Sequence, residues 1–452
     1  ERAAAPQAEE ERGPVISAGT TGDAAAFADG PVPVLFVHFG QERIRGSERC
    51  LLDLLAHLDP RRFRPFVWCN AAAMAREVAA LGIPVETDRF TILLDWNPPR
   101  FDVARYAALV RKGLRLVRDN GVRLVHANSG APNQWMVPVA RAARVPLLAH
   151  LHAVYQLRER CTLGLHHAPL AVGVSAAVLQ GLLEDGVPAS RTRVVHNGID
   201  LDRLAVGDAS RLRADLGLRD GEAVVVGIGS LDAGKKFDDL LRALALLRGE
   251  RRAATLLIAG DGPERRRLER LAGELGLTEA VRFLGWRDDV GAILRDAADI
   301  FASASAAESF MLTGAEAAAF GVPVVSTAVG GVVEQVRDGA TGLLVPPNDP
   351  PALAAALRAL VDDPGLRRRL GEAGRTLVRE RFTIQRNVQE LAAAYDELLE
   401  RPRAAFGWTS GWGPVAPWGR LVGAALRRRL GGRRTAGARR DSGDHVTTTA
   451  RR

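Results

Sequence analysis

Residues 223–236 read AVVVGIGSLDAGKK, and this stretch decides how the chain is expected to fold. An apolar run at 223–226 leads into a loop that carries glycines and two adjacent lysines, Lys235 and Lys236. A helical segment at about 238–247 follows. A strand that passes through a glycine-bearing loop into a helix is one unit of a parallel sheet. The backbone N–H groups of such a loop and the start of the helix favour a bound anion, and Lys235 adds a full positive charge.

The loop Gly229–Lys236 misses the nucleoside-triphosphate motif G-x-x-x-x-G-K-[ST] by one residue. Lys236 stands where that motif has a hydroxyl that binds Mg²⁺, and an ammonium group cannot bind a cation. The sequence therefore argues against an NTPase. Two interpretations of the loop remain: an anion site for another chemistry, and a solvated turn with surface lysines.

Short apolar runs alternate with amphipathic helical segments, such as 48–57 and 105–118, on both sides of this unit. Before it, strands are predicted at Val34–Phe39, Phe66–Cys69, Leu124–Ala127, Leu147–Leu151, Ala171–Ser175 and Arg193–Val195. From it onward, strands are predicted at Ala223–Gly227, Thr255–Ala259, Val281–Leu284, Ile300–Ser303, Val322–Ser326 and Gly342–Val345. This alternation is typical of parallel sheets covered on both faces, and it pauses at the turn-rich residues 196–200. We predict an α/β protein of two Rossmann-like, doubly wound lobes that face a central cleft.

The predicted domain boundaries follow from composition as well as pattern. Residues 1–30 lack periodicity and are expected to be a disordered leader; residues 31–200 form the first lobe, 201–383 the second, and 384–400 a closing helix. Residues 401–452, the expected disordered tail, hold 12 arginines against two aspartates, a net charge of +10, whereas the whole chain has +8. The basic charge therefore belongs to the tail and does not indicate a nucleic-acid-binding core. Three widely spaced cysteines suit a reducing compartment and give no metal-site spacing.

Two carboxylates, Glu308 and Glu316, flank seven residues between a predicted strand and an alanine-rich helix. A carboxylate accepts two hydrogen bonds at once, which suits the paired hydroxyls of a ribose or a hexose. The amides of Phe310, Met311, Leu312 and Thr313 would meet an anionic oxygen near the positive end of the helix. The alternative interpretation is a pair of acids that only complement the helix dipole.

Together with its surroundings, this segment resembles the E-x7-E signature of family 4 retaining glycosyltransferases, which have the two-lobed GT-B fold. Other stretches resemble motifs of the same family, in order and over residues 33–400. They are Gly46-Ser47-Glu48, Val174-Ser175, Val195–Asp200, Gly260-Asp261-Gly262-Pro263, Phe283-Leu284-Gly285, Phe320–Ser326, Gly330-Gly331 through Glu334, and Gly339–Val345. The resemblance implies transfer of a hexosyl-type sugar from a nucleotide-diphosphate sugar, a UDP- or GDP-sugar, with no cofactor required.

The resemblance also implies roles for individual residues in the second lobe. Lys235 would reach the donor diphosphate, Glu308 would contact hydroxyls of the donor sugar, and Glu316 would bind the ribose. Ser230 stands where the family usually has an arginine, so one phosphate contact is lost or replaced by a hydroxyl. Met311 replaces a common glycine, but only its backbone N–H would be needed.

The remaining implied contacts come from both lobes. Gly285, Trp286 and Arg287 would border the base. His152 matches a first-lobe histidine at a strand end that faces the donor sugar, although a structural role is common for such a residue and His150 lies beside it. Gly46 would let its loop approach the donor phosphate or the acceptor closely.

The acceptor side is open at this point. A glycan, a lipid-linked or a small-molecule acceptor fits, as in polysaccharide or glycolipid biosynthesis, and a cytoplasmic location, with a possible one at the inner face of the membrane, is expected. The tail pairs tryptophans 408, 412 and 418 with arginines, which suits peripheral membrane contact or a disordered extension. Asp200-Leu201-Asp202 fits a D-x-D metal motif that arises freely by chance, and no metal is expected. The alternatives are a sugar-nucleotide epimerase, a phosphorylase on the same fold, and a non-catalytic nucleotide-sugar-binding protein.

Overall fold

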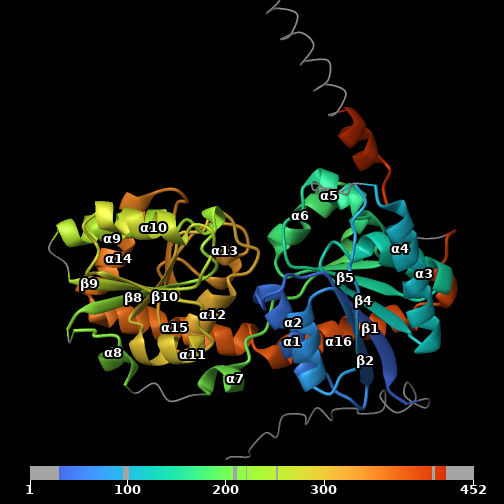
Figure 1. Cartoon of the computed structure of the whole chain (residues 1–452), viewed down its shortest axis with the longest axis horizontal. Helices are drawn as coiled ribbons and strands as arrows, with labels where there is room; N and C mark the ends of the chain where they lie inside the picture. Colours follow the sequence, from blue (N-terminus) through green and yellow to red (C-terminus); the bar gives the residue numbers. More distant parts are fainter. Residues whose placement is uncertain are drawn as a thin grey trace, which may run out of the picture.

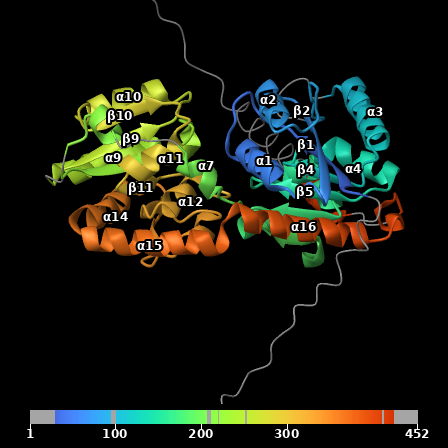
Figure 2. The same cartoon turned by 90° about the horizontal axis from the view of Figure 1, so that it is seen from below.

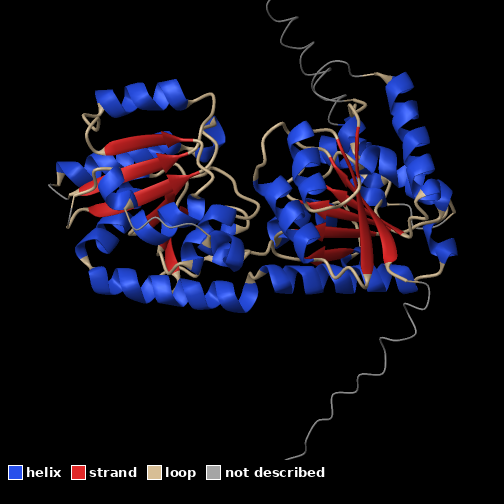
Figure 3. Cartoon of the chain, turned by 60° about the horizontal axis from the view of Figure 1, so that its bottom comes forward, coloured by secondary structure: helices blue, strands red, loops and turns tan. Residues whose placement is uncertain are grey.

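A computed structural model of the protein describes residues 30–94, 101–206, 211–219, 221–250, 253–409 and 413–423. These residues form two α/β lobes that lie side by side (Figure 1). Each lobe is built on one parallel sheet with helices on both faces (Figure 3). The predicted leader, except residue 30, lies outside the described residues, as do 410–412 and 424–452 of the predicted tail.

In the described part of the first lobe, seven strands form one sheet. Their spatial order is β3 (Val85–Thr87), β2 (Phe63–Cys69), β1 (Val32–His38), β4 (Leu124–Asn128), β5 (Leu147–Leu151), β6 (Leu170–Gly173) and β7 (Thr192–Val194). The helices are α1 (Gly46–His57), α2 (Ala72–Ala80), α3 (Val103–Asp119), α4 (Asn133–Ala143), α5 (Leu157–Thr162) and α6 (Ala176–Glu184), with short 3₁₀ turns η1 (Leu165–His167) and η2 (Ala189–Arg191). Strand β3 was not predicted, because three partly exposed residues at a sheet edge give no apolar run.

The strands of the first lobe carry apolar side chains on both faces of the sheet. In β1, Val34 and Phe36 join the core under α1 and α2, whereas Leu35 and Val37 join the core on the side of α3, α4 and α6. Burial on both faces explains why the strands read as continuous rather than alternating apolar runs.

The second lobe repeats this plan with six strands among its described residues. Their order is β10 (Val281–Gly285), β9 (Ala254–Ala259), β8 (Ala223–Ile228), β11 (Ile300–Ser303), β12 (Val324–Thr327) and β13 (Gly342–Val345). The helical elements are α7 (Leu201–Ala205), α8 (Leu212–Asp215), η3 (Ala233–Lys235), α9 (Phe237–Gly249), α10 (Arg265–Glu274), α11 (Val290–Ala292), η4 (Ile293–Ala297), α12 (Leu312–Ala319), α13 (Val332–Gln335), α14 (Pro350–Asp362) and α15 (Pro364–Arg381). The opening sequence therefore forms β8 and α9, as predicted, and the loop between them contains the 3₁₀ turn η3.

The chain crosses between the lobes twice, and the two crossings lie against each other. The Ile199 N–H donates to Phe382 O at 2.8 Å, and the Ile384 N–H donates to Ile199 O at 3.1 Å. Gly198 allows this approach, since a Cβ there would lie 2.4 Å from Ile384 Cα. The last long helix, α16 (Ile384–Glu400), then packs beneath the first lobe in line with α15 beneath the second (Figure 2).

The carboxyl ends of the two sheets meet. Ser175 follows β6 and Gly331 follows β12, and a Cβ on Gly331 would lie 2.8 Å from the Ser175 Cβ. Glu334 of the second lobe forms hydrogen bonds with the first lobe here. Its carboxylate accepts from the Ala176 N–H and from His196 Nε2, each at 2.9 Å. This edge is where a doubly wound sheet binds ligands.

The predicted tail differs from expectation over its described residues. A 3₁₀ turn, η5 (Arg403–Phe406), follows α16, and residues 416–423 are helical. Phe406 is buried, and Arg420 forms an ion pair with the buried Asp185 of the first lobe. The start of the tail is therefore packed onto the first lobe because it has an apolar anchor and a charge partner there.

Candidate functional site

Lys235 and Glu308, two of the residues expected at the site, lie together at the carboxyl end of the second sheet. Lys235 ends η3, and Glu308 lies in the loop between β11 and α12. The Lys235 Nζ forms a direct ion pair with Glu308 Oε1, and Ser305 Oγ donates to the same oxygen at 2.9 Å. A small pocket lies beside this pair, and Thr313 and Phe237 also line it. Lys235 and Glu308 thus both line a small depression beside the ends of β8 and β11.

The loop before Lys235 is held by Asp232. Its Oδ1 accepts hydrogen bonds from the Gly234 N–H at 3.0 Å and the Lys235 N–H at 3.3 Å, and its Oδ2 accepts from Ser230 Oγ. Ser230, which replaces the arginine of the motif that this loop resembles, therefore stabilises the loop through its hydrogen bond to Asp232. Lys236 adopts a left-handed conformation with φ of 52°, which ends η3 and starts α9.

The amides at the start of α12 are only partly free, which corrects one expectation. The Met311 N–H donates to Gln335 Oε1 at 2.8 Å, and Gln335 Nε2 donates back to Met311 O at 3.2 Å. The Leu312 N–H donates to Phe310 O at 3.1 Å. Met311 and Leu312 therefore do not offer their amides to a ligand in this conformation, because a glutamine from α13 and the tight turn before α12 already use them.

The loop at 308–310 is pressed against two glycines. The Gly331 N–H donates to Glu308 O at 2.9 Å, and a Cβ on Gly330 would lie 1.9 Å from that oxygen. Gly330 also has a φ of 50°, which favours glycine. Phe310 fills the space beyond, where its ring packs edge-on to Phe382 with centroids 5.7 Å apart. Close contact with the backbone of Gly330 and Gly331 thus fixes the position of Glu308.

Glu316 lies in a buried cluster of charges that spans both lobes. Its side chain is 6% exposed, and Oε1 lies 3.3 Å from an Arg203 nitrogen. The same guanidinium contacts Asp53 of α1 at 3.3 Å, and the Asp53 side chain is 4% exposed. Burial raises the pKa of Glu316 to about 7, and the charge of Arg203 only partly opposes that rise. Burial raises the pKa of Asp53 as well. Two acids therefore share the guanidinium of Arg203, and Arg49 lies 3.9 Å from Asp53 as a more distant second cation.

This cluster predicts a pH-dependent stability. Glu316 has its folded pKa raised from 4.5 to about 7, so between these values the folded protein keeps a proton that the unfolded chain releases. The stability that this proton contributes is complete below the unfolded pKa and is lost as pH rises through the folded one. We expect Glu316→Gln to make the free energy of unfolding less pH-dependent between about pH 5 and pH 8, by about 2 kcal/mol.

Urea unfolding at several pH values measures this effect. Glu372→Gln on the exposed face of α15 is the matched control, because Glu372 is largely solvated and its ion pair with Arg375 lies at the surface. Parallel pH curves for wild type and Glu316→Gln would show that Glu316 does not carry the titration.

The first lobe contributes a hydrogen-bonded chain at the ends of β1, β4 and β5. His152 Nε2 lies 2.9 Å from Asn128 Oδ1, and Asn128 Nδ2 lies 3.0 Å from His38 Nδ1. His38 Nε2 lies 3.2 Å from Glu48 Oε1. Burial acts to raise the pKa of Glu48, but the hydrogen bond and charge of His38 outweigh it and lower that pKa to about 2. Glu48 is therefore a fixed negative charge at this edge.

His152 and His150 separate in the structure. Burial, and then the charge of His150, hold the pKa of His152 well below its usual range, so its ring is neutral. Its Nδ1 has no hydrogen-bond partner among the described residues. His150 instead points into the lobe, where its Nδ1 lies 3.3 Å from His126 Nε2, and His126 reaches Tyr395 of α16 at 2.7 Å. His150 Nε2 likewise has no hydrogen-bond partner among the described residues, but His150 is buried, whereas His152 is partly exposed.

The residues predicted near the base lie at the end of β10. Gly285 has a φ of 70°, Trp286 is 44% exposed, and Arg287 pairs with Asp289. Arg43 of the first lobe places its guanidinium carbon 5.7 Å from the centre of the Trp286 ring. Of these three residues, Trp286 therefore also contacts the opposite lobe.

Gly46 begins α1 and is exposed, with no atom within 4 Å of the position a Cβ would take. The close approach in this loop occurs instead at Gly40, where a Cβ would lie 2.4 Å from Glu48 Oε1. Asp200 of the D-x-D triplet caps α7 by accepting from the Arg203 N–H at 3.0 Å. Among the described residues, no group of three His, Cys, Asp or Glu side chains could hold a metal ion.

The sequence did not reveal the residues whose hydrogen bonds and ion pairs hold the site residues in place. They are His38, Asn128, Arg203, Gln335 and the bridging role of Glu334. His38 and Asn128 are the last residues of β1 and β4, so their strand-end positions were a usable signal.

Across the described ranges, no helix is both long and apolar enough to cross a membrane.

Family comparisons divide at the boundary between the lobes. Residues 44–203 match the description Glycosyltransferase Family 4, and residues 208–377 match the description Glycosyl transferases group 1. The two matches together span every strand of both sheets except β1. They include every site residue described above except His38, Gly40, Arg43, Phe382 and Tyr395.

Curated relatives and a solved structure agree with these matches. D-inositol 3-phosphate glycosyltransferase of Salinispora arenicola is 40% identical over 236 residues, which are 48% of this chain and 51% of that protein. The chain thus spans about half the length of that relative. N-acetyl-alpha-D-glucosaminyl L-malate synthase of Bacillus anthracis is 27% identical over 312 residues, 67% of this chain and 80% of that protein. Anabaena HepE in complex with UDP and glucose has a TM-score of 0.71 and 26% identity, covering 81% of this chain and all of that one.

Proposed function

The chain belongs to the group 1 glycosyltransferases of family 4, and from this we propose that it transfers a hexosyl-type sugar from a UDP- or GDP-sugar to a hydroxyl-bearing acceptor, with retention of configuration. The observation that carries the proposal is the meeting of Lys235 and Glu308 beside a pocket at the carboxyl end of the second sheet. A UDP donor is favoured over a GDP donor because HepE, the similar solved structure, was found with UDP and glucose.

The chemistry requires charge to be stabilised on the leaving diphosphate. The bond between the anomeric carbon and the diphosphate oxygen breaks, so negative charge grows on the phosphate and positive charge on the sugar ring. Lys235 and the N-terminal end of α12 supply positive charge where the phosphate would lie. In the unliganded arrangement Glu308 neutralises Lys235, and the incoming phosphate would replace that carboxylate as its partner.

Glu308 would then turn to the hydroxyls of the sugar, and His152 would face the same sugar from the first lobe. Its unpartnered Nδ1 is a neutral ring nitrogen that can accept or donate one hydrogen bond. Arg203 contacts Oε1 of Glu316, and no described residue is hydrogen-bonded to Oε2. We assign that oxygen to a ribose hydroxyl.

Same-face attack by the acceptor hydroxyl would retain configuration, with the leaving phosphate taking the acceptor's proton. Closure of the lobes would exclude water, whose attack would destroy the donor. The acceptors in the names of the two relatives, inositol phosphate and malate, are small hydroxyl-bearing anions. We propose a small molecule of that kind or a glycan or lipid-linked acceptor, met in the cytoplasm or at the inner face of the membrane.

An assay of nucleoside-diphosphate release, UDP or GDP according to the donor, with product mass analysis tests the proposal. UDP-glucose, UDP-N-acetylglucosamine and GDP-mannose are each combined with acceptors that include D-inositol 3-phosphate and L-malate. We expect nucleotide release that depends on an acceptor, and a product with the donor's anomeric configuration by NMR. Donor conversion without an acceptor would indicate an epimerase, and donor binding without turnover over the panel would indicate a binding protein.

Ser230 allows a second prediction about donor binding. A charge-assisted phosphate contact contributes about 1.5–3 kcal/mol, so Ser230→Arg should tighten UDP binding about tenfold or more in calorimetry. Ser230→Ala is the control, and it should change UDP affinity little, because Ser230 Oγ is already bonded to Asp232. Unchanged affinity in Ser230→Arg would mean that the new guanidinium pairs with Asp232 and does not reach the diphosphate.

A further inference from the structure

Asn128 holds the ring of His152 at the carboxyl edge of the first sheet. It is the last residue of β4, it is 1% exposed, and its Oδ1 lies 2.9 Å from His152 Nε2. Nδ1 of the same ring has no hydrogen-bond partner among the described residues. Within the part of the chain that the structure describes, the hydrogen bonding of this ring therefore depends on one amide.

The backbone directly after Asn128 keeps the ends of β4 and β5 together. Ser129 has a φ of 126°, which a residue other than glycine rarely adopts, and its N–H donates to His150 O at 2.9 Å. Asn128 and His150 are also paired in the register of the two strands. Strain of this kind persists where the surrounding structure fixes it, and it is common at ligand sites. Asn128 and His152 are thus held beside each other by the backbone as well.

The far side of the Asn128 amide is anchored to a buried carboxylate. His38 Nδ1 lies 3.0 Å from Asn128 Nδ2 and 2.9 Å from Asn128 O, and His38 Nε2 lies 3.2 Å from Glu48 Oε1. The other Glu48 oxygen accepts from the Arg45 N–H at 3.2 Å and from Ser47 Oγ at 3.1 Å. The amide therefore lies inside a chain of contacts that runs from Glu48 to His152.

The contact with Asn128 assigns the proton on the His152 ring. Burial, and then the charge of His150, hold the pKa of His152 well below its usual range, so the ring is neutral and carries one N–H. Because Oδ1 of Asn128 accepts hydrogen bonds and cannot donate them, that N–H is at Nε2 and Nδ1 keeps a lone pair. A buried acceptor without a partner is costly until a donor group pairs with it, and the donor groups of a hexose are its hydroxyls.

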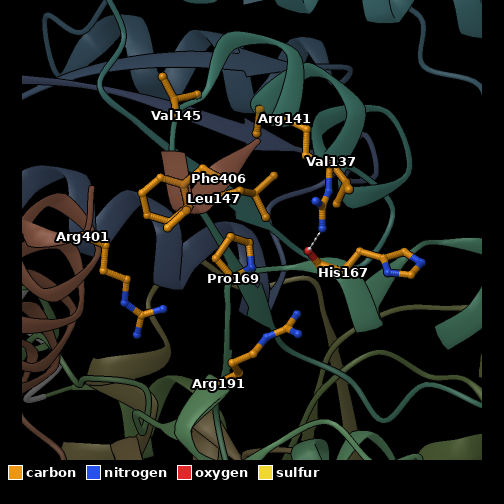
Figure 4. Close-up of a pocket in the computed structure, with 11 residues that line it drawn as sticks. Val137, Arg141, Val145, Leu147, His167, Pro169, Arg191, Arg401 and Phe406 are labelled. Carbon is orange, nitrogen blue, oxygen red and sulfur yellow. Dashed lines mark hydrogen bonds between the residues drawn. The ribbon is translucent and has the colours of Figure 1, made fainter. Parts of the chain in front are cut away.

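The pocket in Figure 4 is separate from this arrangement. It lies at the amino ends of β5 and β6, where Leu147, Pro169 and Phe406 are among the residues that line it. No residue of the chain from Glu48 to His152 is part of that lining. A group that pairs with His152 Nδ1 therefore belongs to the carboxyl edge of the sheet, where the two lobes meet.

We propose that Asn128 is a positioning residue for the donor sugar: it fixes His152 with Nδ1 as a hydrogen-bond acceptor, so that the site selects a sugar with a free hydroxyl opposite that nitrogen. This inference rests on the proposed transferase function, but the state of the ring can be measured without any donor. Fluorine in place of that hydroxyl cannot donate and would leave the acceptor unpaired, so such a donor is disfavoured.

Nitrogen NMR of the full chain with isotopically labelled histidine measures the ring directly. We expect wild-type His152 to carry its proton on Nε2 at neutral pH, its signals being identified by their loss in His152→Ala. Asn128→Leu should give a mixture of the two neutral forms, whereas Asn128→Asp keeps an oxygen opposite Nε2 and should keep the proton there. Any other wild-type state would overturn the proposal, as would a wild-type pattern that Asn128→Leu leaves unchanged.

Calorimetry without an acceptor measures the consequence for the sugar, using UDP-glucose and analogues in which one hydroxyl at a time is replaced by fluorine. Wild type should bind at least one analogue about tenfold or more weakly than UDP-glucose. His152→Ala and Asn128→Leu should lose that difference and keep their affinity for UDP. Asn120→Leu is the matched control, because it removes an amide at the end of α3, and it should keep the difference.

The outcomes separate this proposal from the proposed function. A difference that Asn128→Leu retains and His152→Ala loses would overturn the role of Asn128, and equal binding of all analogues by wild type would overturn the acceptor role of Nδ1. Failure to bind any UDP- or GDP-sugar would refute the proposed function instead. The NMR result would then decide by itself whether Asn128 fixes the His152 ring.

Discussion

Replacing Lys235 with alanine is expected to reduce donor-dependent turnover about 10²–10³-fold, the usual cost of removing one group that stabilises a developing anion in an enclosed site. Lys235 is the residue of η3 whose ammonium group reaches Glu308 at the carboxyl end of β8 and β11. Its loss would leave the leaving diphosphate without this charge, and it would leave Glu308 to repel the same phosphate. Initial rates at saturating donor separate this effect from weaker donor binding.

Lys236→Gly is the matched control for charge. It removes a lysine from the adjacent position, and glycine accepts the left-handed conformation found there. The control should keep most of its activity, because no hydrogen bond or ion pair joins the Lys236 ammonium group to another described residue. Comparable losses in both variants would show that the general charge of the loop matters and that Lys235 has no special position.

Replacing Arg203 with methionine is expected to lower the free energy of unfolding by about 3–5 kcal/mol near pH 8, because it leaves two buried carboxylates without their shared cation. Arg203 lies between Asp53 of the first lobe and Glu316 of the second. At lower pH the same variant should lose less stability, since Asp53 and Glu316, whose pKa values are raised in the folded state, can then take up protons there and no longer leave buried negative charges. Chemical denaturation at about pH 8 and about pH 5 gives the comparison.

Two further variants make the result specific. Arg386→Met breaks an exposed ion pair with Glu390 on α16 and should cost no more than about 1 kcal/mol. Adding Asp53→Asn and Glu316→Gln to Arg203→Met should recover much of the stability, because the unpaired charges are gone. A loss that is equal at both pH values and is not recovered would mean that Arg203 acts by packing rather than by charge.

The fold was predictable because the information is local. Each strand of a parallel sheet covered on both faces is an apolar run, and each run here ends in turn residues, as β8 does at Gly229. The family resemblance drawn from ordered motifs is confirmed by the matches to both lobes. Strand β3 was not predicted, because its three residues are partly exposed and form no apolar run.

The site was predictable only in part. Lys235 and Glu308 could be paired because both follow strands of one sheet, and parallel strands bring such positions to one edge. The charge cluster at Glu316 could not be predicted, because Arg203 and Asp53 come from a hinge helix and from the other lobe. The hydrogen bond that the Met311 N–H donates could not be predicted either, because its acceptor is the side chain of Gln335. Pairings of this kind are set by packing between distant segments and leave no local pattern.

The packing of α16 has a consequence for how the protein is made. Leu391, Tyr395 and Leu398 of this helix belong to the same buried cluster as Val34 and Phe36 of the first strand. The underside of the first sheet is therefore covered only in part, by α1 and α2, until α16 has left the ribosome. A nascent chain that stops short of residue 384 would expose the rest of that hydrophobic underside, however complete its second lobe.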